Sequence, residues 1–260
     1  MLNRRSFFTL PVLAAGATRL RAAEPKRHTA RVTKLFRSPD GNPNALETVP
    51  EGFWLGEQIT DNAYLLDHNG KVLRKVPTES SNTSGIAFGG GYLWMAANGK
   101  TQWRTPRPTD ATTGEIVKAD PRTGKTIARY PIPGGGGVHG IEYADGKLWI
   151  TSLKLQKLSV VDPKDFSLVH QIPVHLGRAH GLGWDHDTIW CMHSNERQVH
   201  KLRVKDGALL EIVQLGANDP DPHGMCLSGG KLYYCDAGIA PTGKNNASPH
   251  AGWVCRIDIV

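Results

Sequence analysis

The sequence has few of the features by which many functional classes are recognised. Its four cysteines are too few for a disulfide-dense scaffold and lack the C-x-x-C spacing of a zinc finger. No apolar stretch reaches the roughly 18 residues that a membrane-spanning helix needs. The chain also contains no G-x-S-x-G elbow, phosphate-binding loop, H-E-x-x-H helix or Rossmann glycine fingerprint. The commonest hydrolase, nucleotide-binding and metalloprotease signatures are therefore absent.

Glycine and proline, by contrast, are plentiful. The 260 residues include 29 Gly and 17 Pro, which predicts frequent turns and few long helices. Apolar residues make up 39% and charged residues 21%, a composition typical of a globular protein. The 31 basic and 24 acidic side chains give a net charge of +7. Taken alone, that balance favours an anionic partner such as nucleic acid or a membrane surface.

The N-terminal residues explain much of this charge. Arg4-Arg5 and two phenylalanines precede a short, weakly apolar segment and the small residues Ala22-Ala23. The pattern resembles a bacterial twin-arginine export signal. It predicts a signal peptide at residues 1–23, a mature domain at 24–260, and a periplasmic or secreted protein. A basic membrane-surface helix is the alternative, against which Pro11 argues.

Removal of this segment changes the expected partner. It takes away four arginines and no acidic residue, so the net charge falls from +7 to 7 − 4 = +3. Nucleic acid and membrane are then no longer favoured partners, and we expect a small anionic molecule instead. The oligomeric state is left open.

The rest of the chain is a repeat. Segments beginning at His139-Gly140, His180-Gly181 and His223-Gly224 each contain an apolar strand, a Gly- or Asp-rich turn and a second strand with an aromatic residue. Looser copies begin at Asn44 and Ser84. Two further strands follow in the first four copies, so that four strands recur about every 40 residues, as in a propeller blade.

The fifth copy ends after its third strand, and residues 31–36 read like the missing fourth. We therefore predict an all-β protein, a single five-bladed β-propeller of four-stranded blades, with the ring closed by the N-terminal strand. A β-sandwich is the alternative, although a sandwich requires no such repeat. Trp54, Trp94, Trp149, Trp190 and Tyr233 share one register and are expected to pack between blades.

The three His-Gly pairs provide the strongest candidate site. His139, His180 and His223 open the innermost strands of consecutive blades, while Asn44 and Ser84 occupy the same register in the other two. Three imidazoles converging on the channel would suit a divalent metal ion, with zinc as the first choice. Each following glycine would let the neighbouring backbone pack closely. The alternative is that these histidines only hydrogen-bond a carbonyl group or water.

Other polar residues are expected on the same face, near the long loops 98–114 and 236–252. As general acids or bases we expect His193, Glu196 and Asp236. Asn44 and Ser84 are further candidates for substrate contact, and the candidates in loops are Arg178, Arg104, Arg107, Lys244, His250 and, for stacking, Trp103. A solvated polar rim is the alternative for each. Cys235 and Cys255 fall on adjacent strands, where buried free thiols are favoured over a disulfide.

With this repeat, the mature chain resembles secreted propellers that include virginiamycin B lyase, SMP-30/gluconolactonase and NHL-repeat proteins. Peptidyl-hydroxyglycine amidating lyases of this group bind zinc through channel histidines, which implies the same role for His139, His180 and His223. Those enzymes have six or seven blades rather than five. Bacterial glutaminyl cyclotransferases have five, and their inner strands are similar to Gly140-Ile141-Glu142, but His-Gly here replaces their Thr-Gln-Gly.

The sequence and this resemblance together predict an exported, metal-dependent propeller enzyme. A lyase acting on a small polar or carboxylated substrate is the leading expectation. The alternatives are a non-catalytic propeller that binds a ligand or partner, and an enzyme similar to glutaminyl cyclotransferases or lactone hydrolases.

Overall fold

The computed structural model describes residues 24–101, 103–238 and 248–260. The predicted export signal at 1–23 and the predicted substrate contact Lys244 lie outside these residues. Within them the chain forms twenty β-strands and no helix, as the sequence predicts. No described segment is therefore a helix long and apolar enough to cross a membrane.

Three sheets contain four antiparallel strands each, in chain order. They are β2 (Pro43–Val49), β3 (Gly52–Glu57), β4 (Asn62–Asp67) and β5 (Val72–Pro77); β6 (Thr83–Gly89), β7 (Tyr92–Ala97), β8 (Glu115–Ala119) and β9 (Thr126–Pro131); and β10 (Ile141–Ala144), β11 (Lys147–Ser152), β12 (Lys157–Val161) and β13 (Leu168–Pro173). A larger, eight-stranded sheet has the order β14 (Ala179–Asp185), β15 (Thr188–His193), β16 (Gln198–Arg203), β17 (Leu209–Gln214), β1 (Lys26–Arg37), β20 (Trp253–Ile259), β19 (Lys231–Cys235) and β18 (Met225–Ser228).

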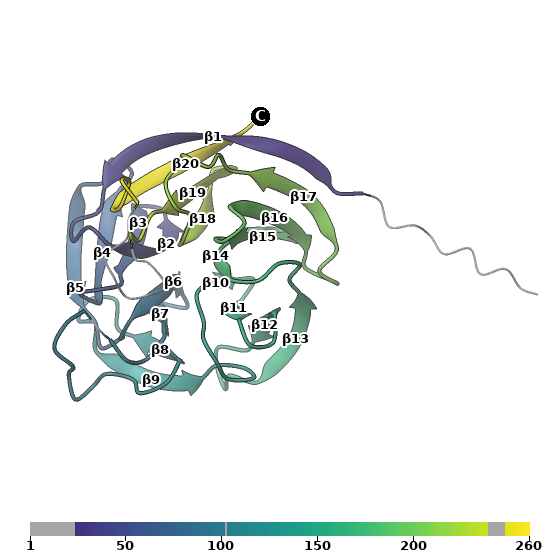
Figure 1. Ribbon diagram of the computed structural model, residues 1–260. Helices are drawn as coiled ribbons and strands as arrows, with labels where there is room; N and C mark the ends of the chain where they lie inside the picture. Colours follow the sequence, from purple (N-terminus) through teal and green to yellow (C-terminus); the bar gives the residue numbers. More distant parts are fainter. Residues whose placement is uncertain (1–23, 102, 239–247) are drawn as a thin grey trace, which may run out of the picture.

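The sheets are arranged in a ring around a central axis (Figure 1). Strands β2, β6, β10, β14 and β18 lie innermost, and each contacts the next in this order, with β18 returning to β2. Strands β5, β9, β13 and β17 lie on the outside. The first residues of the inner strands consequently meet at one end of the ring.

The N-terminal strand joins the two ends of the chain. Residues Ala30–Arg37 of β1 pair antiparallel with β20, as predicted for the strand that completes the last repeat. The preceding residues Lys26–Thr29 pair parallel with β17, which the sequence does not predict. One strand therefore covers the edges of two neighbouring groups of strands, and this pairing merges them into the eight-stranded sheet.

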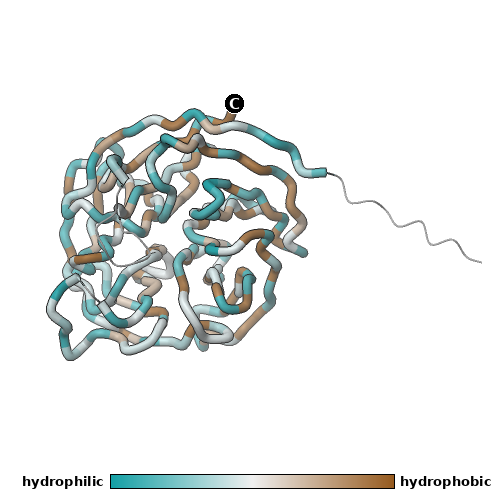
Figure 2. The backbone as a smooth tube through the Cα atoms, viewed as in Figure 1, coloured by the Kyte–Doolittle hydropathy of each residue, from teal (hydrophilic) through white to brown (hydrophobic). Residues whose placement is uncertain are grey.

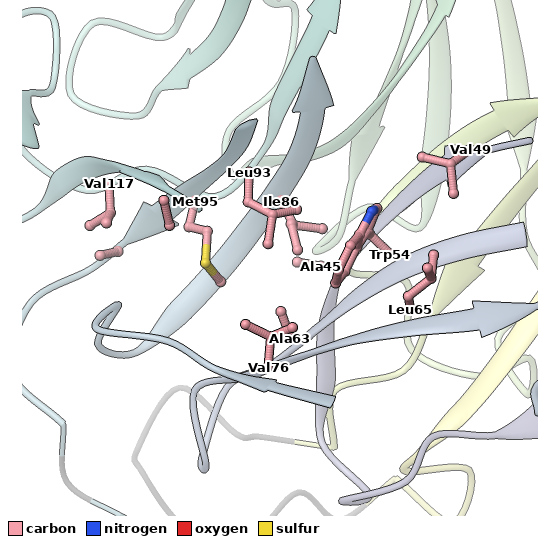
Figure 3. Close-up of a cluster of buried hydrophobic side chains, with 12 residues drawn as sticks. Ala45, Val49, Trp54, Ala63, Leu65, Val76, Ile86, Leu93, Met95 and Val117 are labelled. Atoms are coloured by element: carbon pink, nitrogen blue, oxygen red, sulfur yellow. The ribbon is translucent and has the colours of Figure 1, made fainter. Parts of the chain in front are cut away.

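The hydrophobic core is divided among the interfaces between groups of strands. Figure 2 shows apolar residues distributed around the whole ring, and the buried ones form five separate clusters. In one cluster Trp54 and Leu65 pack against Ile86 and Met95 of the next sheet (Figure 3). The four tryptophans of the shared register are no more than 4% exposed, so their predicted packing role is confirmed.

All four cysteines are buried free thiols. Cys235 and Cys255 lie on adjacent strands, but Cys235 is opposite Val254 and Cys255 is opposite Tyr234. This offset of one residue directs the two side chains to opposite faces of the sheet. They belong to different core clusters, and the favoured prediction of free thiols is confirmed.

Glycines at the starts of the inner strands allow neighbouring strands to approach closely. A Cβ atom added to Gly140 would lie 1.9 Å from the carbonyl oxygen of His180. A Cβ atom on Gly224 would lie 2.6 Å from the Cα of Ala45, which closes the ring between β18 and β2. The glycine after each histidine therefore has the packing role that the sequence suggests.

This packing predicts the effect of a methyl group at the interface. Gly140→Ala should lower the free energy of unfolding by about 1–3 kcal/mol or more, because the methyl group meets rigid backbone. Gly177→Ala is the matched control, since a Cβ atom there meets nothing within 4 Å. Urea unfolding of both variants checks the prediction, and equal stabilities would contradict it.

Candidate functional site

The five residues of the shared register lie together at one end of the ring of sheets, where the inner strands begin. Asn44 lies against Ser84, with the Asn44 Nδ2 atom donating a hydrogen bond of 3.1 Å to Ser84 Oγ. The ring centroids of His139 and His180 are 4.5 Å apart, and those of His180 and His223 are 5.1 Å apart. These five residues therefore form two parts, an amide–hydroxyl part made of Asn44 and Ser84 and an imidazole part made of the three histidines.

A hydrogen-bonded network stabilises the amide–hydroxyl part and connects it to the histidines. Asn44 also donates to Gln58 Oε1 at 2.8 Å, and Asn98 Nδ2 donates to Ser84 Oγ at 2.9 Å. The other side-chain atom of Asn98, Oδ1, accepts from the backbone N–H of Val138 at 2.9 Å. Asn44 and Ser84 thus help to position the strand that begins beside His139.

The imidazole part contains polar atoms without partners. Both ring nitrogens of His180 and the Nδ1 atom of His139 are buried and make no hydrogen bond among the described residues. Burying such an atom without a hydrogen-bond partner costs roughly 1–3 kcal/mol, because its hydration is lost and nothing replaces it. The Nδ1 atom of His223 lies 3.2 Å from the Asp221 carbonyl oxygen. His180 therefore has the clearest unused capacity to bind something.

All three imidazoles are neutral at pH 7. Burial, with a smaller contribution from the nearby positive charge of Arg178, lowers the pKa of His139 to about 3 and that of His223 to about 4. Burial also lowers the pKa of His180 well below its usual value, with smaller contributions from the other two histidines and Arg178. Neutral imidazoles can each accept one proton or hydrogen bond.

Arg178 places an unpaired positive charge beside these imidazoles. It precedes β14 in a loop, is half-buried, and has a left-handed backbone φ of 43°. Its Nη1 atom donates a long hydrogen bond of 3.3 Å to Asn195 Oδ1, and within the described chain it makes no ion pair. Burial lowers its pKa, which the charge of Asp221 partly offsets. The missing counterion makes this site suitable for an anion.

Asp236, an expected acid or base, has a different environment. It is fully buried, and burial raises its pKa. Its Oδ2 atom accepts from Ser248 Oγ at 2.6 Å and from the Asp221 N–H at 2.9 Å, and Oδ1 accepts from the Gly238 N–H at 2.9 Å. Because these bonds hold the backbone that contacts His223, the geometry gives Asp236 a positioning role.

His193 and Glu196 lie in a second histidine cluster. The His193 ring is 4.4 Å from that of His200, and its Nδ1 atom is 3.2 Å from the Gly177 carbonyl oxygen. The His193 Nε2 and Glu196 Oε2 atoms are buried without partners. The structure thus groups His193 with His200, and the charge of Glu196 is near enough to offset part of the lowering of the His193 pKa by burial. In the described part of the chain, the ring contacts of His193 do not include His139, His180 or His223.

The two arginines of the loop 98–114 are used to anchor that loop. Arg104 bridges Asp61 and Asp110 with N–O distances of 2.6 and 2.7 Å. Arg107 donates to the carbonyl oxygens of Thr78 and Ser80 at 2.9 and 2.7 Å. Contact of either guanidinium with substrate would require these bonds to break.

The remaining predicted contacts lie in the loops. The His250 Nδ1 atom is 2.8 Å from Lys34 Nζ, and the backbone N–H of Trp103 is 3.4 Å from Thr101 Oγ1. Arg178 is consequently the one predicted substrate-binding arginine that the structure leaves without an anionic partner in the described residues.

Two glutamates on the inner strands lie together, of which the sequence pointed only to Glu142, through the similarity to glutaminyl cyclotransferases. Glu47 and Glu142 are 4% and 6% exposed, and their carboxyl groups hydrogen-bond to each other. Burial raises the pKa of Glu142 to about 8 and that of Glu47 well above its usual value. The signal in the sequence was their register, since Glu47 lies three residues after Asn44 and Glu142 lies three residues after His139.

The residues at the predicted metal site fit a metal ion only in part. Imidazole nitrogens suit zinc and related ions, and His180 has both of them unpartnered. Among the described residues, however, no group of three or more His, Cys, Asp or Glu side chains is placed to hold a metal ion. The donor chemistry therefore suits an ion, whereas the present placement of the donors does not.

Comparison with known proteins identifies the fold. No protein-family model and no curated protein sequence matches the chain. A solved structure of glutaminyl cyclase from Myxococcus xanthus is similar with a TM-score of 0.68 at 13% identity, covering 91% of this chain and 98% of that one. A streptogramin B lyase structure is similar with a TM-score of 0.52 at 14% identity, covering 89% of this chain and 98% of the lyase.

Virginiamycin B lyase from Staphylococcus aureus matches with a TM-score of 0.50 at 16% identity, covering 86% of this chain and 69% of the lyase. At these identities the likeness shows the fold alone. Together with the ring of sheets, it shows that the protein is a β-propeller.

The glutamate pair predicts a pH dependence of stability. Because the folded-state pKa of Glu142 is raised from 4.5 to about 8, its stabilising contribution is complete below pH 4.5 and is lost as the pH rises through 8. Glu142→Gln keeps a neutral hydrogen-bonding group and should reduce this loss, on the order of a few kcal/mol, between pH 5 and 9. Urea unfolding across that range measures it, and parallel profiles would contradict the prediction.

Proposed function

We propose that this protein is a propeller enzyme that binds a small carboxylated substrate at the channel mouth. The observation that carries the proposal is the half-buried guanidinium of Arg178, which forms no ion pair with any described residue and lies within electrostatic reach of three buried neutral histidines. A carboxylate would supply the missing counterion, and the two unpartnered nitrogens of neutral His180 would donate one hydrogen bond and accept another from neighbouring polar groups of the substrate.

We infer that the fold is a five-bladed propeller. The eight-stranded sheet divides into β14–β17 and a group made of β18, β19, β20 and the first strand β1. The cyclic contacts among five inner strands support this count. In this arrangement the three histidines belong to consecutive blades, so their relative positions depend on the packing between blades.

The chemistry that fits is proton transfer next to a carboxylate. Burial, and to a smaller extent Arg178, lowers the pKa of the histidines, so the negative charge of a substrate carboxylate would raise the pKa of each imidazole part of the way back toward its ordinary value. In a lyase reaction, His180 would take a proton from the carbon beside the carboxylate. The C–H electron pair would form a double bond as the leaving group departs with its own bonding pair. Substrate binding would thereby prepare the base.

Loss of Arg178 should remove this binding. Arg178→Met keeps most of the apolar stem and should weaken binding of small carboxylates by roughly tenfold or more, the usual effect of a charge-assisted hydrogen bond. Isothermal titration with acetate, succinate and malate measures it. Arg122→Met, at an exposed site, is the control. If none of these binds the wild type, or if Arg178→Met binds equally well, the proposal fails.

A divalent ion at His139, His180 and His223 is a second candidate for the site. It is favoured by two imidazoles with unpartnered nitrogens, His139 through Nδ1 and His180 through either ring nitrogen. When bound, such an ion would polarise a substrate oxygen. Arg178 would oppose it electrostatically unless an anion also binds.

Metal analysis distinguishes the two candidates. A metal site predicts about one equivalent of zinc or a related ion in the purified protein. The variant with all three histidines changed to Gln should then contain none. A wild-type protein without bound metal after incubation with Zn²⁺ would exclude this candidate, and carboxylate binding by Arg178 would remain.

A further inference from the structure

A pocket lies at the end of the propeller opposite the histidines. It has a volume of about 420 Å³ and is lined by the turns that follow inner strands, at Gly90 and Gly146, and by residues 162–164 of the turn between β12 and β13. Strand β10 starts beside His139 and ends at the turn that contains Gly146, so the pocket and His139 lie at opposite ends of this strand. The pocket is therefore separate from the channel-mouth site.

Aromatic rings and amines form its walls. Tyr92 and Trp94 come from β7, Tyr143 from β10 and Lys118 from β8. The Lys118 Nζ atom lies 3.9 Å from the centre of the Tyr92 ring and 5.1 Å from that of Trp94. The volume falls in the range typical of small-molecule sites.

The charges in the pocket are not balanced. Lys118, Lys147 and Lys164 face a single acid, Asp162, which gives 3 − 1 = +2. Lys147 is paired with Asp162 at 2.8 Å. Neither Lys118 nor Lys164 forms a side-chain ion pair with any described residue. Two amines are thus available to an anionic ligand.

Two other pairs of strands carry a cation opposite an aromatic residue in the same register, and they can be compared with Lys118 and Trp94. Lys118 lies opposite Trp94, just as Lys201 lies opposite Trp190 and Arg256 opposite Tyr233. The other two cations are neutralised: Lys201 by Asp185 at 2.9 Å and Arg256 by Asp258 at 2.9 Å.

Packing of a lysine amine over the tryptophan therefore occurs at both Lys118 and Lys201, whereas among the three compared positions Lys118 alone has no carboxylate partner in the described residues. Packing alone does not explain that absence. A bound anion would complete the pattern.

We propose that this pocket binds a carboxylated six-membered ring, a sugar acid or an aromatic acid. The carboxylate would pair with Lys118 and Lys164, and the ring would lie against Tyr92 and Tyr143. Gly146 leaves the rim open, since a Cβ atom there would meet nothing within 4 Å, whereas a Cβ atom on Gly90 would lie 3.3 Å from the Tyr143 hydroxyl oxygen. Both ligand types share this chemistry, and titration separates them.

The experiment uses the folded domain carrying Arg178→Met, so that the channel-mouth site does not contribute. Glucuronate, benzoate and neutral glucose are titrated by calorimetry. We expect one or both acids to bind and glucose not to bind. Adding Lys118→Met should weaken acid binding by roughly tenfold or more. Adding Lys201→Met, the matched control, should leave it unchanged, with circular dichroism confirming that each variant is folded.

The outcomes separate this pocket from the proposed function. Binding by glucuronate alone assigns a sugar acid, and binding by benzoate alone assigns an aromatic acid. Glucose binding as tightly as glucuronate, no binding by either acid, or equal affinities in the Lys118→Met and Lys201→Met variants would overturn the proposal. None of these results depends on whether Arg178 binds a carboxylate.

Discussion

The close approach of neighbouring inner strands is the constraint on which the rest of this structure depends. At Gly140 the carbonyl oxygen of His180 occupies the space that a side chain would need, and Gly224 packs in the same way against Ala45. This contact brings His139, His180 and His223 close enough for their rings to touch. A larger residue after any of these histidines would push apart both the strands and the imidazoles.

The same approach determines the electrostatics of the channel. Groups on the inner strands leave water on folding, so the histidines are held neutral and the Glu47–Glu142 pair retains a proton. Arg178 is only partly buried and keeps its charge without forming an ion pair in the part of the chain that the structure describes. A positive entrance above neutral bases and a protonated acid pair is suited to an anion that brings its own negative charge.

The sequence predicted the repeat well and individual side-chain roles less well. The positions of the strands follow from turns and apolar alternation, which are local signals, and the closing strand follows from the incomplete last repeat. Arg104 illustrates the limit. As a loop arginine it was expected to contact substrate, but it is bonded to Asp61, 43 residues earlier in the chain. No local pattern marks such a partner.

By itself the sequence determined the all-β repeat, the register of the five ring residues and the glycines between them, because each is written within a few residues of chain. Only the tertiary structure decided which charges are neutralised. It paired Arg104 and Lys201 with carboxylates and left Arg178 and Lys118 without any in the described residues. The physical reason is that an ion pair depends on distances between segments far apart in sequence, which the packing of the ring sets.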